Sequence, residues 1–191
     1  MKIKKLFYLF KIIISKNSTA YSILIYEFLR IIFFPLNLLL SFIEKIFFKS
    51  QKNNHVPIIF VIGSHRSGCT FVAQTLLRKL NVYGLNNLNN IFNQSSIIIS
   101  KLNKKIPYSY GEIKNYYGQT KNLFDINDNY PVWDRWFGNE HDFIKKDNLK
   151  KTKGLNEYFA NIHKIIKKPI LTKNGRNIFA LKELNILFKN S

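Results

Sequence analysis

One short segment of the sequence has the residue types and the spacing of an anion-binding loop. Residues 63–70 read GSHRSGCT, which matches the phosphate-loop pattern GxxxxGK[ST] except that Cys69 stands in the lysine position. A glycine-framed turn that enters a helix points several backbone N–H groups, and the positive end of the helix dipole, at one anion. We therefore expect an anion site at the start of the helix that follows.

The side chains of this loop narrow the choice of anion. Arg66 carries a planar guanidinium that suits a tetrahedral oxyanion, and the hydroxyls of Ser67 and Thr70 can donate as well. In nucleotide triphosphatases the loop lysine, absent here, neutralises the β- and γ-phosphates. The loop therefore fits a phosphosulfate, which carries fewer negative charges, better than a triphosphate. The residues expected to bind the anion are Gly63, Ser64, His65, Arg66, Ser67, Gly68, Cys69 and Thr70.

The loop lies between segments that predict a strand and a helix. Residues 57–62 read PIIFVI, a short apolar run typical of a buried parallel strand. Residues 71–80 have the pattern of a helix. Strand, glycine loop and helix in this order form the opening unit of an α/β fold. The expected inward face of the helix consists of Val72, Leu76, Leu77 and Leu80.

Further elements follow along the chain. The asparagine-rich residues 81–103 predict a helix with a connecting loop, and residues 108–143, rich in aromatics, Gly and Asp, suggest loops and short helices that line a cleft. Residues 155–167 have apolar side chains at helical spacing and predict an amphipathic helix. Residues 170–172 predict a strand, and residues 178–188 a last helix. The expected fold class is α/β with a central parallel sheet.

The N-terminal region is apolar and basic. Residues 31–43 contain no charge, but this run is too short for a spanning helix, which needs about 20 residues, and Pro35 interrupts it. We expect either a helix that lies in the membrane interface or a pair of helices broken near Pro35. The alternative is that these helices simply pack on the globular domain. The lysines that could contact anionic lipid are Lys2, Lys4, Lys5, Lys11 and Lys16.

A polar stretch divides the chain into two expected regions. Residues 50–55 read SQKNNH and predict a hinge, so that residues 1–54 form an apolar basic helical region and residues 55–191 the α/β domain. No small-residue cleavage site follows the apolar segment, which argues against a signal peptide. The expected location is the cytoplasm, with peripheral association at the membrane surface.

The amino-acid composition limits the classes of ligand that we expect. The 30 Lys and Arg against 11 Asp and Glu give a net charge of +19, which attracts polyanions, anionic lipid or phosphorylated ligands. Nucleic acid is not expected, because the lysines are scattered and no nucleic-acid-binding motif accompanies them. Many lysines, asparagines and isoleucines are also explained by a compositional bias of the source genome. Cys69 is the single cysteine, which excludes an intramolecular disulfide and a cysteine-based zinc site.

The loop and its flanks resemble a known family. Residues 57–77, PIIFVIGSHRSGCTFVAQTLL, are similar to the 5′-phosphosulfate loop of sulfotransferases that use 3′-phosphoadenosine 5′-phosphosulfate (PAPS), usually written FIxGxPRSGTTxLxxLL. His65 replaces the usual proline, and Cys69 replaces the first threonine. The resemblance implies a P-loop-like α/β/α fold and PAPS as co-substrate, with no metal. The acceptor would be a hydroxyl or amine, with a glycan or lipid suggested by the membrane.

The resemblance continues downstream. Residues 110–122 and 132–138 are similar to the acceptor-side region of bacterial members, and residues 171–188 resemble the segment that precedes the 3′-phosphate strand. The family's arginine-aspartate pair and serine, which hold the 3′-phosphate, would lie beyond Ser191, so we expect an incomplete domain. Two other functions stay open. One is a P-loop nucleotide kinase or NTPase, and the other is a non-catalytic, membrane-associated remnant.

Catalysis needs a cation and a base. Arg66 is the expected cation for the departing phosphate. The base candidates are His141, Glu112, Asp134 and Glu140; His141 is favoured by the ordinary pKa of histidine, although an exposed loop histidine is the commoner case. Two tryptophans, Trp133 and Trp136, either stack on an acceptor sugar or belong to the core.

Overall fold

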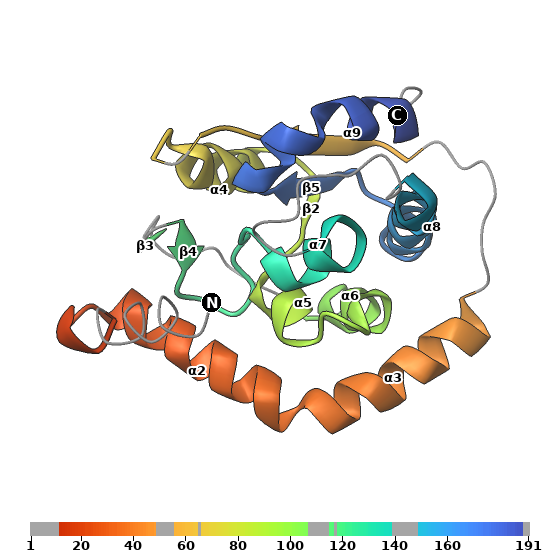
Figure 1. Ribbon diagram of the computed structural model, residues 1–191. Helices are drawn as coiled ribbons and strands as arrows, with labels where there is room; N and C mark the ends of the chain where they lie inside the picture. The colour runs from red at the N-terminus through yellow and green to blue at the C-terminus, as the bar shows by residue number, and fades with distance from the viewer. Residues whose placement is uncertain are drawn as a thin grey trace.

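The computed structural model describes residues 12–48, 56–64, 66–106, 115–116, 118–138 and 149–188. Within them the chain forms an α/β structure in which helices surround a small sheet, with two further helices along one side (Figure 1). The predicted hinge at residues 50–55 and the predicted base candidates Glu112, Glu140 and His141 lie outside the described residues.

The sheet is parallel, as the sequence predicts. It consists of β1 (Ile58–Val61), β5 (Ile170–Lys173) and β2 (Tyr83–Gly84) in the order β1-β5-β2. β5 lies in the middle, with Ile170 in register with Ile58 on one side and with Tyr83 on the other. The two predicted strands are thereby confirmed, whereas the two-residue β2 lies in a segment for which only a helix and a loop were predicted.

Alternate residues of the strands feed two separate apolar clusters, because successive side chains of a strand point to opposite faces. Ile59, Val61 and Leu171 pack with α4 (Cys69–Lys79) in one cluster. On the other face, Ile58, Phe60 and Ile170 pack with three further helices. These are α7 (Tyr130–Phe137), α8 (Leu149–Ile166) and α9 (Leu181–Leu187), which follows the 3₁₀ helix η2 (Gly175–Ala180).

The inward face of α4 agrees with the predicted one only in part, since Leu76 and Leu77 pack in the cluster beside the sheet as predicted. Val72 and Leu80 are exposed, while Ala73, Gln74 and Leu77 are buried. Thr70, at the start of the helix, is also buried, and its hydroxyl donates to the Gly118 carbonyl at 3.3 Å. This contact accompanies a rotation of the helix that places the residues three, four and seven positions later toward the sheet.

The helix predicted at residues 155–167 is confirmed by α8, whose apolar side chains form the centre of the larger cluster. Phe159 and Ile162 are fully buried. Trp133 and Trp136 of α7 are buried in the same cluster, where the Trp133 ring lies 5.8 Å from that of Phe159. Of the two predicted roles for the tryptophans, core packing is therefore the one that the structure shows.

Among the described residues, two successive helices before the sheet meet at an angle. α2 (Ser18–Ile32) and α3 (Phe34–Phe47) are bent by 65° at Phe33, with Pro35 in the first turn of α3, where a proline is tolerated. The prediction of a helix pair broken near Pro35 is thus confirmed. Among the described residues, no helix alone has both the length and the apolarity needed to span a bilayer; only this bent pair reaches them, and only when taken together.

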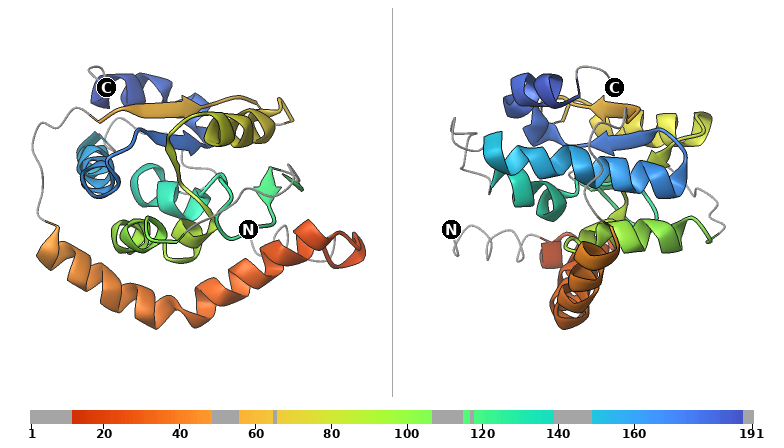
Figure 2. Two further views of the ribbon diagram at one scale, coloured as in Figure 1. Left: turned by 180° about the vertical axis from the view of Figure 1, so that it is seen from behind. Right: turned by 90° about the vertical axis from the view of Figure 1, so that its right-hand side faces the viewer.

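The α2–α3 pair runs along the side of the domain that carries α5 (Asn87–Ile91) and α6 (Ser96–Asn103), as both views in Figure 2 show. Glu44 of α3 is buried and accepts a hydrogen bond of 2.8 Å from the backbone N–H of Ile98, in the first turn of α6. Asn37, also buried, donates to Asn93 at 3.0 Å and accepts from the Ser95 hydroxyl at 2.8 Å. Polar contacts thus attach α3 to the domain.

Candidate functional site

The loop after β1 leads into α4, whose N-terminus has no side-chain cap. Gly68 is the N-cap residue of α4, in the left-handed region with φ 80°, and no side chain accepts from the first turn. Arg66 also has a positive φ, 66°, which is uncommon for a residue with a side chain. The first N–H groups of a helix have no acceptor within it, so the start of this 11-residue helix offers donors and a positive dipole end to an anion.

Gly63 allows the loop to fold closely on itself. A Cβ at this position would lie 2.5 Å from the Cys69 sulfur and 2.7 Å from the Ser67 hydroxyl oxygen, distances at which something must move. The loop is closed by short contacts, since the Ser67 hydroxyl lies 2.8 Å from the Ser64 carbonyl and 3.0 Å from the Cys69 sulfur. The glycine at the start of the motif is therefore a steric requirement of this conformation.

The loop side chains differ in how they are engaged. The hydroxyls of Ser67 and Thr70, expected to donate to the anion, are instead placed to donate to the carbonyls of Ser64 and Gly118. Arg66 is exposed, and Cys69 is partly buried as a free thiol. His65 lies outside the described residues. In this conformation no side chain caps the first-turn amides of α4, which remain as donors for an anion.

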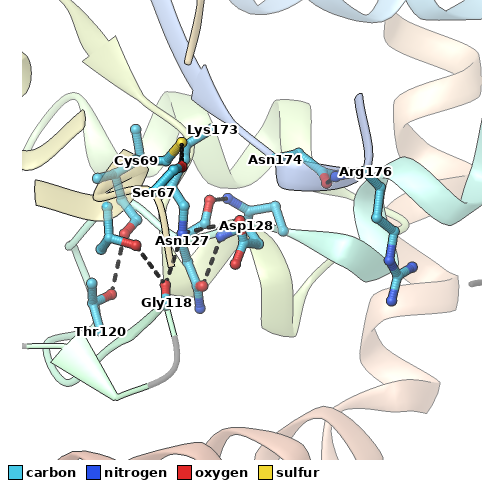
Figure 3. Close-up of polar contacts among 12 residues, drawn as sticks. Ser67, Cys69, Gly118, Thr120, Asn127, Asp128, Lys173, Asn174 and Arg176 are labelled. Carbon is cyan, nitrogen blue, oxygen red and sulfur yellow. Dashed lines mark hydrogen bonds and ion pairs between the residues drawn. The ribbon is translucent and has the colours of Figure 1, made fainter. Parts of the chain in front are cut away.

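A buried lysine from the neighbouring strand lies beside the loop (Figure 3). Lys173, the last residue of β5, places its Nζ 3.0 Å from the Asp128 carboxylate and 2.8 Å from the Gly118 carbonyl, which also accepts from Thr70. Both members of the ion pair are nearly inaccessible, with side chains 3% and 6% exposed. Because parallel strands end at the same edge of a sheet, β5 brings this cation next to the loop that follows β1.

Sequence reasoning missed this pair. Lys173 lies within the segment whose resemblance was noted, but no role was predicted for it, and Asp128 was not considered at all. A lysine directly after a predicted buried strand was the one available signal. Its acidic partner, 45 positions earlier in the chain, follows no motif.

Asparagines hold the segment that carries Gly118 and Asp128. Asn87, fully buried, donates to the Thr120 carbonyl at 3.2 Å, to the Thr120 hydroxyl at 3.0 Å and to the Asn122 carbonyl at 2.8 Å. Its own carbonyl accepts from the Asn127 amide. Asn129 donates to the carbonyls of Leu85 and Asn127, both at 2.9 Å. These asparagines therefore have structural roles that a bias in composition alone does not explain.

Asp134 is the one predicted base candidate within the described residues, and it is already paired. Its carboxylate lies 3.0 Å from the Arg176 guanidinium, and that guanidinium also stacks over the Tyr130 ring, with 3.8 Å between its carbon and the ring centroid. Figure 3 shows Arg176 directed away from Ser67 and Cys69. The structure thus does not bring Asp134 to the loop as a free base.

Among residues 12–48, 56–64, 66–106, 115–116, 118–138 and 149–188, no cluster of three or more His, Cys, Asp or Glu side chains could hold a metal ion. Comparison with known proteins gives no further guide, since no family model, no curated protein and no solved structure matches this chain.

Proposed function

We propose that this chain binds the 5′-phosphosulfate of PAPS at residues 63–70 and transfers its sulfuryl group to a hydroxyl or amine acceptor, on a P-loop-like α/β/α domain. One observation carries the proposal. The N-terminus of α4, which no side chain caps, follows β1 through a glycine loop at the carboxyl edge of a parallel sheet. Ligands of open α/β sheets bind at this edge, and anions bind at such helix starts.

The similarity of residues 57–77 to the sulfotransferase loop supports a phosphosulfate as the anion. Cys69 leaves the loop without the lysine that triphosphate chemistry requires, while its backbone N–H is unaffected by the replacement. Lys173 does not replace that lysine in a simple way, because its charge is already balanced by Asp128. A ligand with fewer negative charges than a triphosphate therefore suits the site better.

Sulfuryl transfer requires the protein to stabilise the departing phosphate and to accept one proton. The acceptor oxygen or nitrogen forms a bond to sulfur as the bond from sulfur to the bridging phosphate oxygen breaks, and that electron pair stays on the departing phosphate. First-turn amides of α4 and the Arg66 guanidinium would stabilise the developing charge. The acceptor proton passes to a base, for which His141 and Glu112 remain predictions.

Calorimetric titration of the full chain tests the proposal. The ligands are 3′-phosphoadenosine 5′-phosphate and, separately, ATP with Mg²⁺, and the variants are Arg66→Ala and Lys79→Ala. Lys79 is an exposed cation at the far end of the same helix and controls for a general loss of positive charge. We expect the chain to prefer the bisphosphate. Its affinity for the bisphosphate should fall at least tenfold in Arg66→Ala and stay unchanged in Lys79→Ala.

Two results would contradict the proposal in different ways. Preference for ATP with Mg²⁺ would favour the kinase or NTPase function. If neither ligand binds to a chain whose circular dichroism shows it to be folded, the donor site is not functional and a non-catalytic protein is favoured.

A further inference from the structure

The α2–α3 pair has its polar and apolar faces the wrong way round for a helix pair that only packs on a domain. The buried residues of α3 are Asn37 and Glu44. Large apolar side chains point outward instead. On α3 these are Phe34, Leu36, Leu38, Leu39, Phe42, Ile46 and Phe47, between 43% and 74% exposed, and on α2 they are Tyr21, Ile25, Phe28, Ile31 and Ile32.

The inward side is already satisfied by the domain. The hydrogen bonds of Asn37 and Glu44 hold α3, the Tyr26 hydroxyl of α2 donates to the Lys121 carbonyl, and the Phe33 ring at the bend lies 5.5 Å from the Phe92 ring. A rotation of the pair that buried the outward apolar face would break these contacts. The outward face therefore needs a partner other than this domain.

We propose that this outward face, the twelve exposed side chains of α2 and α3, docks in the interfacial region of a bilayer that contains anionic lipid. The pair would lie on the surface with the domain still attached, because its polar inner contacts face protein. This inference does not rest on the proposed enzymatic function.

The shape and width of the face favour lipid over a second copy of the chain. At about 100° per residue, the exposed apolar residues of α3 cover about 220° of its circumference, more than a flat protein surface reaches. The pair is also convex toward the outside, with the bend furthest from the sheet (Figure 1). Two such rigid convex surfaces would touch over only a small area, whereas a lipid surface can contact both α2 and α3.

Charge at the ends of the pair is complementary to anionic lipid. Lys16, just before α2, and Lys45, near the end of α3, are both exposed, while Arg30 near the bend is paired with Glu27 at 2.5 Å. Four more lysines precede Lys16 in the sequence. An apolar middle flanked by lysines is the distribution of an interfacial anchor, in which the cations contact head groups.

Vesicle co-sedimentation of the full chain tests the proposal. The probes are vesicles of phosphatidylcholine alone and of phosphatidylcholine with about 30% phosphatidylglycerol, a fraction at which adjacent lysines meet anionic head groups. The test variant is Leu39→Ser/Phe42→Ser. The control is Leu181→Ser/Ile186→Ser, which removes two equally exposed apolar side chains from α9, on the opposite side of the molecule.

We expect salt-sensitive binding to the anionic vesicles, reduced at least tenfold in the α3 variant and unchanged in the α9 control. Because all four side chains are exposed, each variant should keep the circular dichroism spectrum of the parent. Equal binding by the α3 variant, or no binding by the parent, would overturn the proposal. If the parent instead forms a dimer in light scattering that the α3 variant dissolves, and does not bind vesicles, a second copy covers the face.

Discussion

Lys173 and Asp128 form an ion pair 3.0 Å long, with both side chains almost completely buried next to the loop of residues 63–70. Lys173 also donates to the Gly118 carbonyl that accepts from Thr70, so the pair ties the end of β5, the start of α4 and the turn at Gly118 together. The pair is a structural support of the loop, and the first prediction follows from it.

Replacing one member of the pair should be far worse than replacing both. Lys173→Met leaves the Asp128 carboxylate buried without its cation, which costs about 3–5 kcal/mol of unfolding free energy. In Lys173→Met/Asp128→Leu no buried charge is left, and much of the loss should be recovered. Urea denaturation of the two variants and the parent measures the difference. Equal stability of the single and double variants would show that the charge of Asp128 is not buried as described.

Gly63→Ala should distort the loop. The added Cβ would meet the Cys69 sulfur and the Ser67 hydroxyl at distances too short to tolerate, and overpacking of this kind costs about 1–3 kcal/mol. Affinity for 3′-phosphoadenosine 5′-phosphate should fall with stability. The control variant combines Gly63→Ala with Ser67→Ala and Cys69→Ala, which remove both colliding atoms. A Gly63→Ala variant as stable in urea as the parent would show that the loop is looser than its contacts indicate.

Asn87→Ala should destabilise the protein, since it leaves the carbonyls of Thr120 and Asn122 and the amide of Asn127 without this partner. Buried polar groups that lose a hydrogen bond cost about 1–3 kcal/mol each, so for three groups we expect a total loss of at least about 3 kcal/mol. Asn81→Ala, at an exposed position, should change stability by less than about 0.5 kcal/mol. Comparable effects of the two substitutions in thermal unfolding would argue against a specific role for Asn87.

Stability should depend on pH through Glu44. Burial raises the pKa of Glu44 from its usual 4.5 to about 7, although the backbone N–H groups of Ile98 and Ile97 and the charge of Arg135 lower it. A carboxyl whose pKa is higher in the folded than in the unfolded protein binds protons preferentially when folded. Its contribution to stability is therefore fully present below about pH 4.5 and is lost as the pH rises through about 7.

The difference in unfolding free energy between the parent and Glu44→Gln isolates this effect from the other titrating groups. It should shift against the parent by about 3 kcal/mol between pH 4.5 and pH 8, because one pKa unit corresponds to about 1.4 kcal/mol. Glutamine can still accept from Ile98, so the fold should persist. If urea titrations show a difference that does not change with pH, Glu44 is solvated rather than buried.

The sequence by itself was sufficient for those features that depend on neighbouring residues. The apolar run before Gly63, the glycines of the loop and the helical spacing after residue 155 are local patterns, and β1, the start of α4 and α8 follow them. Pro35 likewise marked the break between α2 and α3, because a proline fits only the first turn of a helix.

The tertiary structure decided what depends on contacts between distant segments. The rotation of α4 accompanies the contact of Thr70 with Gly118, so Ala73 and Gln74 rather than Val72 and Leu80 face the sheet. Partners such as Lys173 and Asp128, or Glu44 and Ile98, lie 45 and 54 positions apart, and no periodicity joins them. Short-range patterns specify the element, but only packing specifies which side chains meet.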